Sequence, residues 1–204
     1  LYENLPEPYK VTVDDIKRHW NQLYEKLLVT HQNNDHRMVS FLLEDTVHFT
    51  DSTSFKMDKE TYRKYVLLLY DIITQYPVKS ILEQCSAAYF LGQLIIKNGK
   101  KEYDDLVLEW KPLYKFIKYV YCKSDDLNFG SPCYDLENVL MMVSGLSKFF
   151  PEGATEEIIR KFVPHISSRG LNNTVYLVCF AAFVPVKNGV YKSYIKYFNN
   201  ELRD

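Results

Sequence analysis

The sequence predicts an all-α protein in which pairs of amphipathic helices follow one another along the chain. In segment after segment, apolar residues recur at steps of three and four, which gathers them on one face of a helix. No segment alternates apolar and polar residues as a half-buried β-strand would. The pattern predicts about nine helices and no β-sheet over the 204 residues.

The composition is that of a globular chain that can bury its own core. Hydrophobic residues make up 47% of the chain and charged residues 25%, and 204 residues can fold without disulfides or metals. The formal net charge is -1, so no overall field favours nucleic acid or acidic lipid. Aromatic residues reach 15%, and such side chains suit wide helix–helix seams or binding surfaces.

The first two helices follow an extended, proline-containing lead segment. Thr12 and Asp15 have the spacing of a capping box, so the first helix is expected to begin there. Its apolar face consists of Ile16, Trp20, Leu23 and Leu27. The polar stretch 31–35 ends it, and a second helix is expected over about 36–50. The apolar side of that helix consists of Val39, Leu42, Leu43 and Val47.

The third and fourth helices have the clearest periodicity. Asp58 is a good N-cap for the third helix. Its apolar face is Tyr62, Val66, Leu69, Ile73 and Tyr76. Pro77 ends this helix and can occupy the start of the fourth, which is expected to stop near Gly99. The inward residues of the fourth helix are Ile81, Cys85, Ala88 and Ile95.

The fifth helix follows a charged connection over 100–108, with Pro112 in its first turn. Its inward residues are Leu113, Ile117 and Val120. Trp110 precedes this proline and is expected to pack between the fifth helix and a neighbour. We therefore expect Trp110→Ala to cost about 3–5 kcal/mol, the range for emptying a large core site.

Four further helices are expected in the second half of the chain. A sixth runs over about 134–149, and Thr155 caps a short seventh that stops at Pro164. The eighth, about 172–183, is apolar nearly all round, and the ninth covers about 190–202.

The helices pair off through short loops, and the first helices of the pairs begin near residues 12, 58, 110 and 155. This period of roughly 45 to 50 residues is close to that of HEAT or armadillo units. The expected domain is one α-solenoid segment over 1–204, with helix pairs at 12–50, 58–97, 110–150 and 155–184 and a last helix at 190–203. Because the repeats share little literal sequence, an irregular helical bundle is the competing architecture.

No metal site is predicted from the cysteines and histidines. The cysteines have no CxxC spacing and lie in or beside apolar stretches, at Cys85, Cys122, Cys133 and Cys179. They are expected to be reduced, buried thiols of a cytosolic or nuclear protein, with a disulfide pair as the alternative. A zinc site needs about four suitable ligands, and none gather around His19, His31, His36, His48 or His165.

No catalytic or cofactor-binding residue is predicted either, so an enzyme is not expected. Adjacent carboxylates at Asp14-Asp15, Asp125-Asp126 and Glu156-Glu157 are explained by first turns and loops. The sequence contains no GxSxG, P-loop or HExxH motif. Two lysine clusters fit a helix end and a solvated helix face, with phosphate or nucleic-acid contact as the alternative: Lys97, Lys100 and Lys101, and Lys111, Lys115 and Lys118.

Two stretches are similar to a known family. Residues 105–114 read DLVLEWKPLY, and residues 149–157 read FFPEGATEE. Both resemble signatures of the giant, single-chain, ATP-independent proteasome activators (proteasome activator complex subunit 4). The likeness runs in the same order over most of the chain and is densest over about 104–185.

This resemblance implies a HEAT-like wall in a dome over the end of the proteasome core particle. Members of the family favour ATP-independent degradation of peptides and of certain unfolded or acetylated proteins, and are linked to histone turnover and DNA repair. The chain looks like an N-terminal segment and an excerpt of a much larger chain, with the cytoplasm and nucleus as its expected location. The core particle is the expected partner of the full-length protein, and acetylated histones are a further one through other regions.

The chain departs from the family at its end, because Glu201-Leu202-Arg203-Asp204 does not match the aromatic tail with which the family opens the core particle. The acetyl-lysine-reading module and the inositol-phosphate sites also belong mainly to other regions, so no site residue is carried over. No cofactor, membrane contact or direct nucleic-acid contact is expected. The alternative function is a generic HEAT/armadillo-type adaptor for protein–protein interaction.

Overall fold

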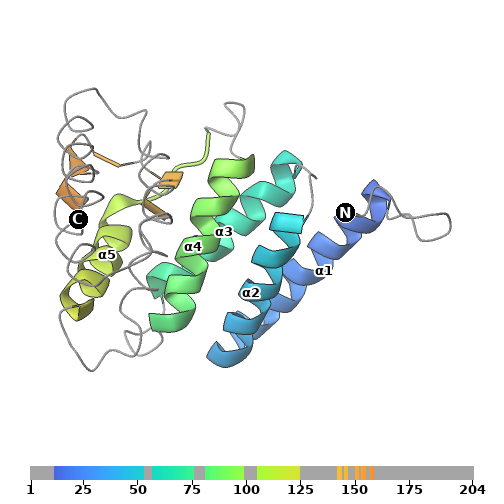
Figure 1. Cartoon of the computed structure of the whole chain (residues 1–204), viewed down its shortest axis with the longest axis horizontal. Coiled ribbons are helices and arrows are strands. Elements are labelled where there is room, and N and C mark those ends of the chain that lie inside the picture. The colour runs from blue at the N-terminus through green and yellow to red at the C-terminus, as the bar shows by residue number, and fades with distance from the viewer. Residues whose placement is uncertain are drawn as a thin grey trace, which may run out of the picture. The chain divides into compact units, whose positions relative to one another are not determined.

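The computed structural model describes residues 12–52, 57–75, 81–98 and 105–124, and part of 142–158. These residues form five α-helices and no strand: α1 (Val13–Gln32), α2 (His36–Ser52), α3 (Lys59–Gln75), α4 (Ile81–Asn98) and α5 (Trp110–Ser124) (Figure 1). The all-α prediction is therefore confirmed for the described residues. The sixth and seventh expected helices are described only in fragments, and the eighth and ninth lie outside the described residues.

The predicted capping box begins α1. The Asp15 amide donates to Thr12 Oγ1 at 3.1 Å, and the Thr12 amide donates back to Asp15 Oδ2 at 3.0 Å. The first backbone amides of a helix have no acceptor inside the helix, and this residue pair provides acceptors for two of them. At the other end the Asn33 amide donates to the Val29 carbonyl at 3.0 Å, and Asn34 takes a left-handed φ of 55°. The polar stretch therefore ends α1 as predicted.

Short polar side chains also begin α2 and α3. Asp35 accepts from the Met38 amide at 3.2 Å at the start of α2. The predicted N-cap of α3 is confirmed, because Asp58 Oδ1 accepts from the Thr61 amide at 2.9 Å. Asp58 Oδ2 also accepts from the Thr61 hydroxyl at 3.0 Å. Each carboxylate satisfies an amide that has no partner inside its helix and lies where the helix dipole favours negative charge.

The buried face of α3 is wider than the sequence predicts. Four predicted core residues are buried as expected, namely Tyr62, Val66, Leu69 and Ile73. A second stripe, Tyr65, Leu68 and Ile72, is buried as well. The reason is that α3 contacts both α1 and α4, so two sides of the helix are covered. The predicted contribution of Tyr76 lies outside the described residues.

Helix α4 contacts both α2 and α3. Its buried apolar residues cover most of its circumference: Cys85, Ala87, Ala88, Phe90, Leu91, Leu94 and Ile95. The helix begins at Ile81, and the suggested role of Pro77 lies outside the described residues.

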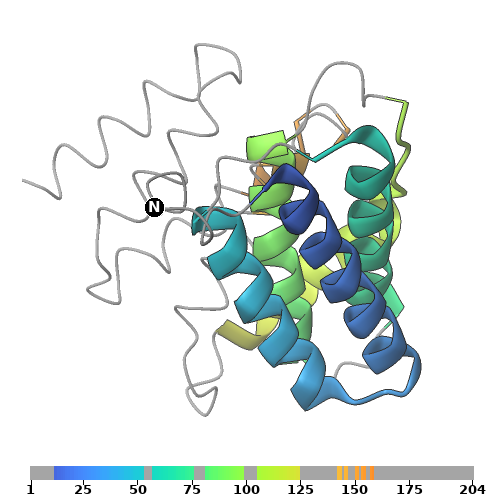
Figure 2. The same ribbon diagram turned by 90° about the vertical axis from the view of Figure 1, so that its right-hand side faces the viewer.

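The first four helices form two layers. Helices α1 and α3 lie side by side in one layer, and α2 and α4 form the other (Figure 2). Each helix thereby contacts its partner in the pair and the neighbouring pair, which is the packing that stacked helical hairpins require. These helices belong to the first of two compact units, Leu1–Leu108, and the second unit is Glu109–Asp204.

In the second unit, α5 buries the three residues that its spacing predicts, namely Leu113, Ile117 and Val120. Pro112 lies in the first turn as predicted, although the helix already begins at Trp110. The arrangement of 1–204 as a single α-solenoid segment of nine helices remains a prediction. No described helix combines the length and apolar character needed to cross a bilayer.

Candidate interaction surface

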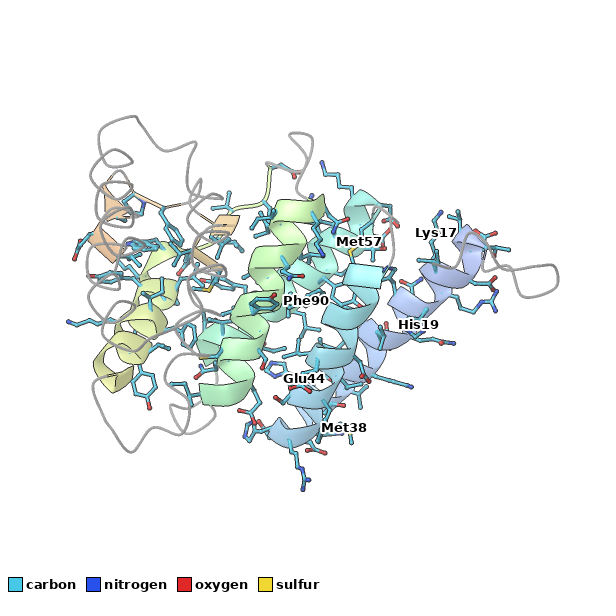
Figure 3. All side chains as sticks on the ribbon, viewed as in Figure 1. Lys17, His19, Met38, Glu44, Met57 and Phe90 are labelled. Carbon is cyan, nitrogen blue, oxygen red and sulfur yellow. The ribbon has the colours of Figure 1, made fainter. Side chains whose placement is uncertain are left out.

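An aromatic cluster centred on Tyr65 joins α1, α3 and α4. The Tyr65 ring meets Trp20 edge to face at 5.3 Å between centroids and Phe90 at 5.9 Å (Phe90 is labelled in Figure 3). The Tyr65 hydroxyl donates to the Trp20 backbone carbonyl at 2.7 Å. Burial raises the pKa of Tyr65 far above its ordinary value, so the hydroxyl stays a donor. Aromatic pairs in this geometry are favourable beyond the area that they bury.

Polar side chains cross-link the same helices. Gln84 Nε2 in α4 donates to the Ile73 carbonyl in α3 at 2.7 Å. The Met57 amide donates to Asn98 Oδ1 at 3.3 Å, which ties the segment before α3 to the end of α4. Buried bonds of this kind resist sliding, because a displaced helix would leave polar groups unsatisfied.

His31 at the end of α1 is the histidine whose partner the structure defines most clearly. Its Nε2 lies 2.8 Å from Asp71 Oδ2 in α3, and both side chains are at least partly buried. This contact joins two helices of one layer and provides no open coordination site. Among the described residues, no group of three or more His, Cys, Asp or Glu side chains could hold a metal ion.

The remaining histidines and cysteines do not form a site in the described part. His19 is exposed on α1 and His36 is half-buried at the start of α2 (His19 is labelled in Figure 3). Cys85 is buried as a thiol, as predicted. The structure does not describe the side chains of His48, His165, Cys122, Cys133 and Cys179.

A charged cluster joins α3 to the connection that precedes α5. Asp105 Oδ2 lies 3.1 Å from Lys59 Nζ and 2.9 Å from Arg63 Nη1. The hydrogen bond from Lys59 and the nearby Arg63 charge hold the pKa of Asp105 below its ordinary value. Asp105 therefore stays ionised and pairs with both cations of α3.

The connection beyond Asp105 alternates in burial. Leu106 and Leu108 point into the first unit and are buried, whereas Val107 between them is 85% exposed. These residues belong to the stretch DLVLEW, on which the family resemblance partly rests. Its acidic and apolar residues thus hold a segment of chain against the first four helices.

An open groove runs along the exposed side of α3. Its described lining residues are Lys59, Glu60, Arg63, Lys64 and Leu67, and its volume is about 420 Å³. Lys64 Nζ lies 2.8 Å from Glu60 Oε1, one helical turn away. The hydrogen bond from Glu60 raises the pKa of Lys64. Leu67 at the end of the groove is 48% exposed.

The two lysine clusters singled out in the sequence fall on exposed positions where they are described. Lys111, Lys115 and Lys118 occupy the exposed side of α5. Lys97 is exposed in the last turn of α4, and Lys100 and Lys101 lie outside the described residues. No described contact brings either cluster to a cavity.

The adjacent carboxylates take local structural roles where they are described. Asp15 closes the capping box, and its hydrogen bonds with Thr12 lower its pKa. Glu157 is exposed and accepts from the Tyr114 hydroxyl at 3.3 Å. Asp125, Asp126 and Glu156 lie outside the described residues.

Trp110 packs against a neighbouring segment, as predicted, but less deeply than expected. Its ring centroid lies 4.2 Å from that of Phe150 and 5.2 Å from that of Tyr114. The side chain is half-buried, so we now expect Trp110→Ala to cost less than the 3–5 kcal/mol of a large core site. The start of a helix has one side open to solvent, so the substitution would not leave a closed cavity. The expected loss of stability therefore comes mainly from the two aromatic pairs.

Sequence reasoning missed the Lys59–Arg63–Asp105 cluster. Arg63 and Asp105 are 42 positions apart, and only the stacking of helices brings them together. One signal was present in the sequence: Lys59, Arg63, Lys64 and Leu67 recur at helical spacing outside the apolar face.

The described residues define a class of protein, namely an all-helical protein whose neighbouring helices are joined by aromatic and polar contacts. Comparison with known proteins then narrows the class. No family profile matches the chain, and no solved structure matches it. Curated proteins do match, and the five such matches found all carry the name proteasome activator complex subunit 4, 4A or 4B.

Three of these relatives show the extent of the likeness. The 4A protein of Danio rerio is 29% identical over 132 residues, which is 64% of this chain and 7% of the relative. The protein of Xenopus laevis is 31% identical over 111 residues, 53% of this chain and 6% of the relative. The protein of Homo sapiens is 26% identical over 132 residues, again 64% and 7%.

The matched region therefore spans about 7% of the length of these relatives. The predicted resemblance is confirmed: the chain is similar to proteins named proteasome activator complex subunit 4.

Proposed function

We propose that this chain is a non-catalytic wall segment of a proteasome activator. The observation that carries the proposal is the match over 64% of the chain to proteins named as proteasome activator subunits. Buried contacts between neighbouring helices support a structural role, because they keep the helices in fixed positions. The described residues contribute caps, seams and ion pairs to this wall.

The proposed architecture is a HEAT-like solenoid of about nine helices, placed toward the N-terminal end of the full-length protein. The starts of α1, α3 and α5 at Val13, Lys59 and Trp110 support it, because they fit a period of roughly 45 to 50 residues. Each helical pair would cover the apolar side of the next, so the wall grows by stacking.

The proposed activity belongs to the full-length protein. It would cap the proteasome core particle and promote the ATP-independent degradation of peptides and of acetylated proteins such as histones, in the cytoplasm and nucleus and in connection with DNA repair. The names of the relatives support the proteasome as the partner. Histones, DNA repair and location follow from the family resemblance alone.

The alternative function is a helical-repeat adaptor that binds a peptide or helix. The open groove on α3 favours this alternative, because an exposed groove with charged and apolar lining residues suits a peptide. An adaptor would show a binding partner without any association with proteasome core particles.

A pull-down separates the two functions. Tagged full-length protein is mixed with purified proteasome core particles in the absence of ATP, and bound core subunits are detected by mass spectrometry. We expect recovery of intact core particles with the tagged protein and none with an unrelated helical-repeat protein of similar size. Failure to recover core particles over a range of salt concentrations would favour the adaptor.

A further inference from the structure

The groove along α3 lies on the exposed side of that helix. Its volume is about 420 Å³, and it is open to solvent. Its lining side chains are open to solvent, with Lys59, Glu60 and Lys64 exposed and Arg63 partly so. A binding partner can therefore reach them without any rearrangement of the helices.

The charge and polarity of the groove select one class of partner. The described lining residues include three cations, Lys59, Arg63 and Lys64, and one carboxylate, Glu60. Leu67 adds an exposed apolar surface. A carboxylate-bearing peptide with a neighbouring apolar side chain can satisfy both features. A nucleic acid fits less well, because Glu60 and Asp105 repel its phosphates and Leu67 offers it no partner.

The chain already places one such segment on these cations. The segment from Asp105 to Leu108 is an acidic residue followed by three apolar ones, and Asp105 Oδ2 contacts both Lys59 and Arg63. Ion pairs between exposed side chains are weak and exchange readily. The Asp105 carboxylate thus occupies the position that a carboxylate of a bound peptide would take. Its contacts indicate that these cations bind carboxylates.

We propose that the α3 groove binds acidic–apolar peptide segments of partner proteins. Carboxylates of the peptide pair with Arg63 and with Lys59 or Lys64, and an apolar side chain packs on Leu67. Asp105 competes with the peptide for Lys59 and Arg63, so it lowers the affinity of the groove. This proposal concerns peptide binding only and stands whether or not the protein associates with proteasome core particles.

The test is a binding titration with a defined probe. Fluorescein-labelled acetyl-Glu-Glu-Leu-Asp-Leu-Glu-amide is titrated with the full-length protein, and binding is followed by fluorescence anisotropy. Arg63→Gln and Lys59→Gln are each expected to weaken binding by about two- to fivefold, the range of single exposed ion pairs. Asp105→Asn is expected to tighten binding by a similar factor.

Control variants and probes test whether changes in affinity arise from the groove. Lys17→Gln removes an exposed cation on α1, outside the groove, and is expected to leave binding unchanged (Figure 3). A probe with Ser in place of both Leu residues is expected to bind more weakly, because Leu67 then has no apolar partner. Circular dichroism melts of all variants confirm that the exposed substitutions leave the fold intact.

Three results would overturn the proposal. The first is that Arg63→Gln and Lys59→Gln bind the probe with the same affinity as the parent protein. The second is an Asp105→Asn variant that binds the probe more weakly, since removal of a competitor must strengthen binding. The third is displacement of the probe by a dodecamer of deoxythymidine at a lower concentration than by unlabelled acidic peptide, which would make the groove a nucleic-acid site.

Discussion

Glu83 is a carboxyl group that folding takes out of water at the start of α4, where it is 8% exposed. Burial raises the pKa of Glu83 above its ordinary value of 4.5, although the backbone amide of Glu83 and the nearby His36 oppose the shift. The folded protein therefore holds this proton more tightly than the unfolded chain does. As pH rises above about 4.5 the unfolded chain ionises first, so the free energy of unfolding falls.

We expect Glu83→Gln to raise the free energy of unfolding at pH 7, because an amide cannot ionise and loses less on burial. The gain should shrink toward zero at pH 4 and below, where the parent carboxyl is protonated in both states. Urea denaturation at the two pH values measures it. Glu44→Gln, an exposed position on α2, serves as the control (Figure 3), and an equal gain in both variants would argue against burial as the cause.

Trp110 shows how a half-buried aromatic side chain ties a helix start to a neighbouring segment. Its two ring partners are Tyr114 and Phe150. Each aromatic pair contributes about 0.5–1.5 kcal/mol, so Trp110→Ala should lower the free energy of unfolding by about 1–3 kcal/mol. Trp110→Phe keeps both ring contacts and should lose less than half as much. Equal losses in the two variants, measured by urea denaturation, would show that ring pairing is not the source.

At the scale of the element, α3 depends on its N-cap. Burial would raise the pKa of Asp58, but its hydrogen bonds from the Thr61 amide and hydroxyl outweigh this effect and hold the pKa below 3.8. A depressed folded pKa means that the unfolded chain takes up the proton first. The contribution of this cap is therefore complete above about pH 4 and is lost as pH falls through the folded pKa.

Asp58→Ala should cost about 1 kcal/mol at pH 7, the usual value of an N-cap, and much less near pH 2. Asp58→Ser keeps an oxygen acceptor without a titrating group, so it should retain most of the stability at pH 7. Its stability should also vary less with pH between 4 and 2. Thermal melts at several pH values measure both effects, and equal destabilisation by Ala and Ser would contradict the capping role.

The seam between α1 and α3 rests on Tyr65. Tyr65→Phe removes the hydrogen bond to the Trp20 carbonyl while keeping the ring, so it should cost about 1 kcal/mol. Tyr65→Ala also empties a fully buried ring site and should cost about 3–5 kcal/mol. A Phe variant as unstable as the Ala variant, in urea denaturation, would show that the ring contributes nothing.

At the scale of the whole molecule, the sequence predicts local structure well and long-range contacts poorly. The caps at Thr12 and Asp58 and the starts of the helices follow from residues within one or two turns, which the sequence displays directly. Pairs such as His31–Asp71 join residues 40 positions apart and depend on how the helices stack. For the same reason the width of the α3 core face and the Asp105 cluster were not predictable.

The resemblance to a family was predictable because it rests on literal sequence. The stretch DLVLEW contains Asp105, which forms ion pairs, two buried leucines and the first residue of α5. Several of its six residues therefore have a structural role.

The central claim, that the chain is part of a proteasome activator, is tested most directly by the peptidase rate of the core particle. Purified core particles are supplied with a fluorogenic peptide, without ATP, and the initial rate is measured as full-length protein is added. We predict a saturable increase in rate that also occurs when any residual ATP is removed with apyrase. A rate that stays at the level of core particles alone, at concentrations well above that of the core, would contradict the claim.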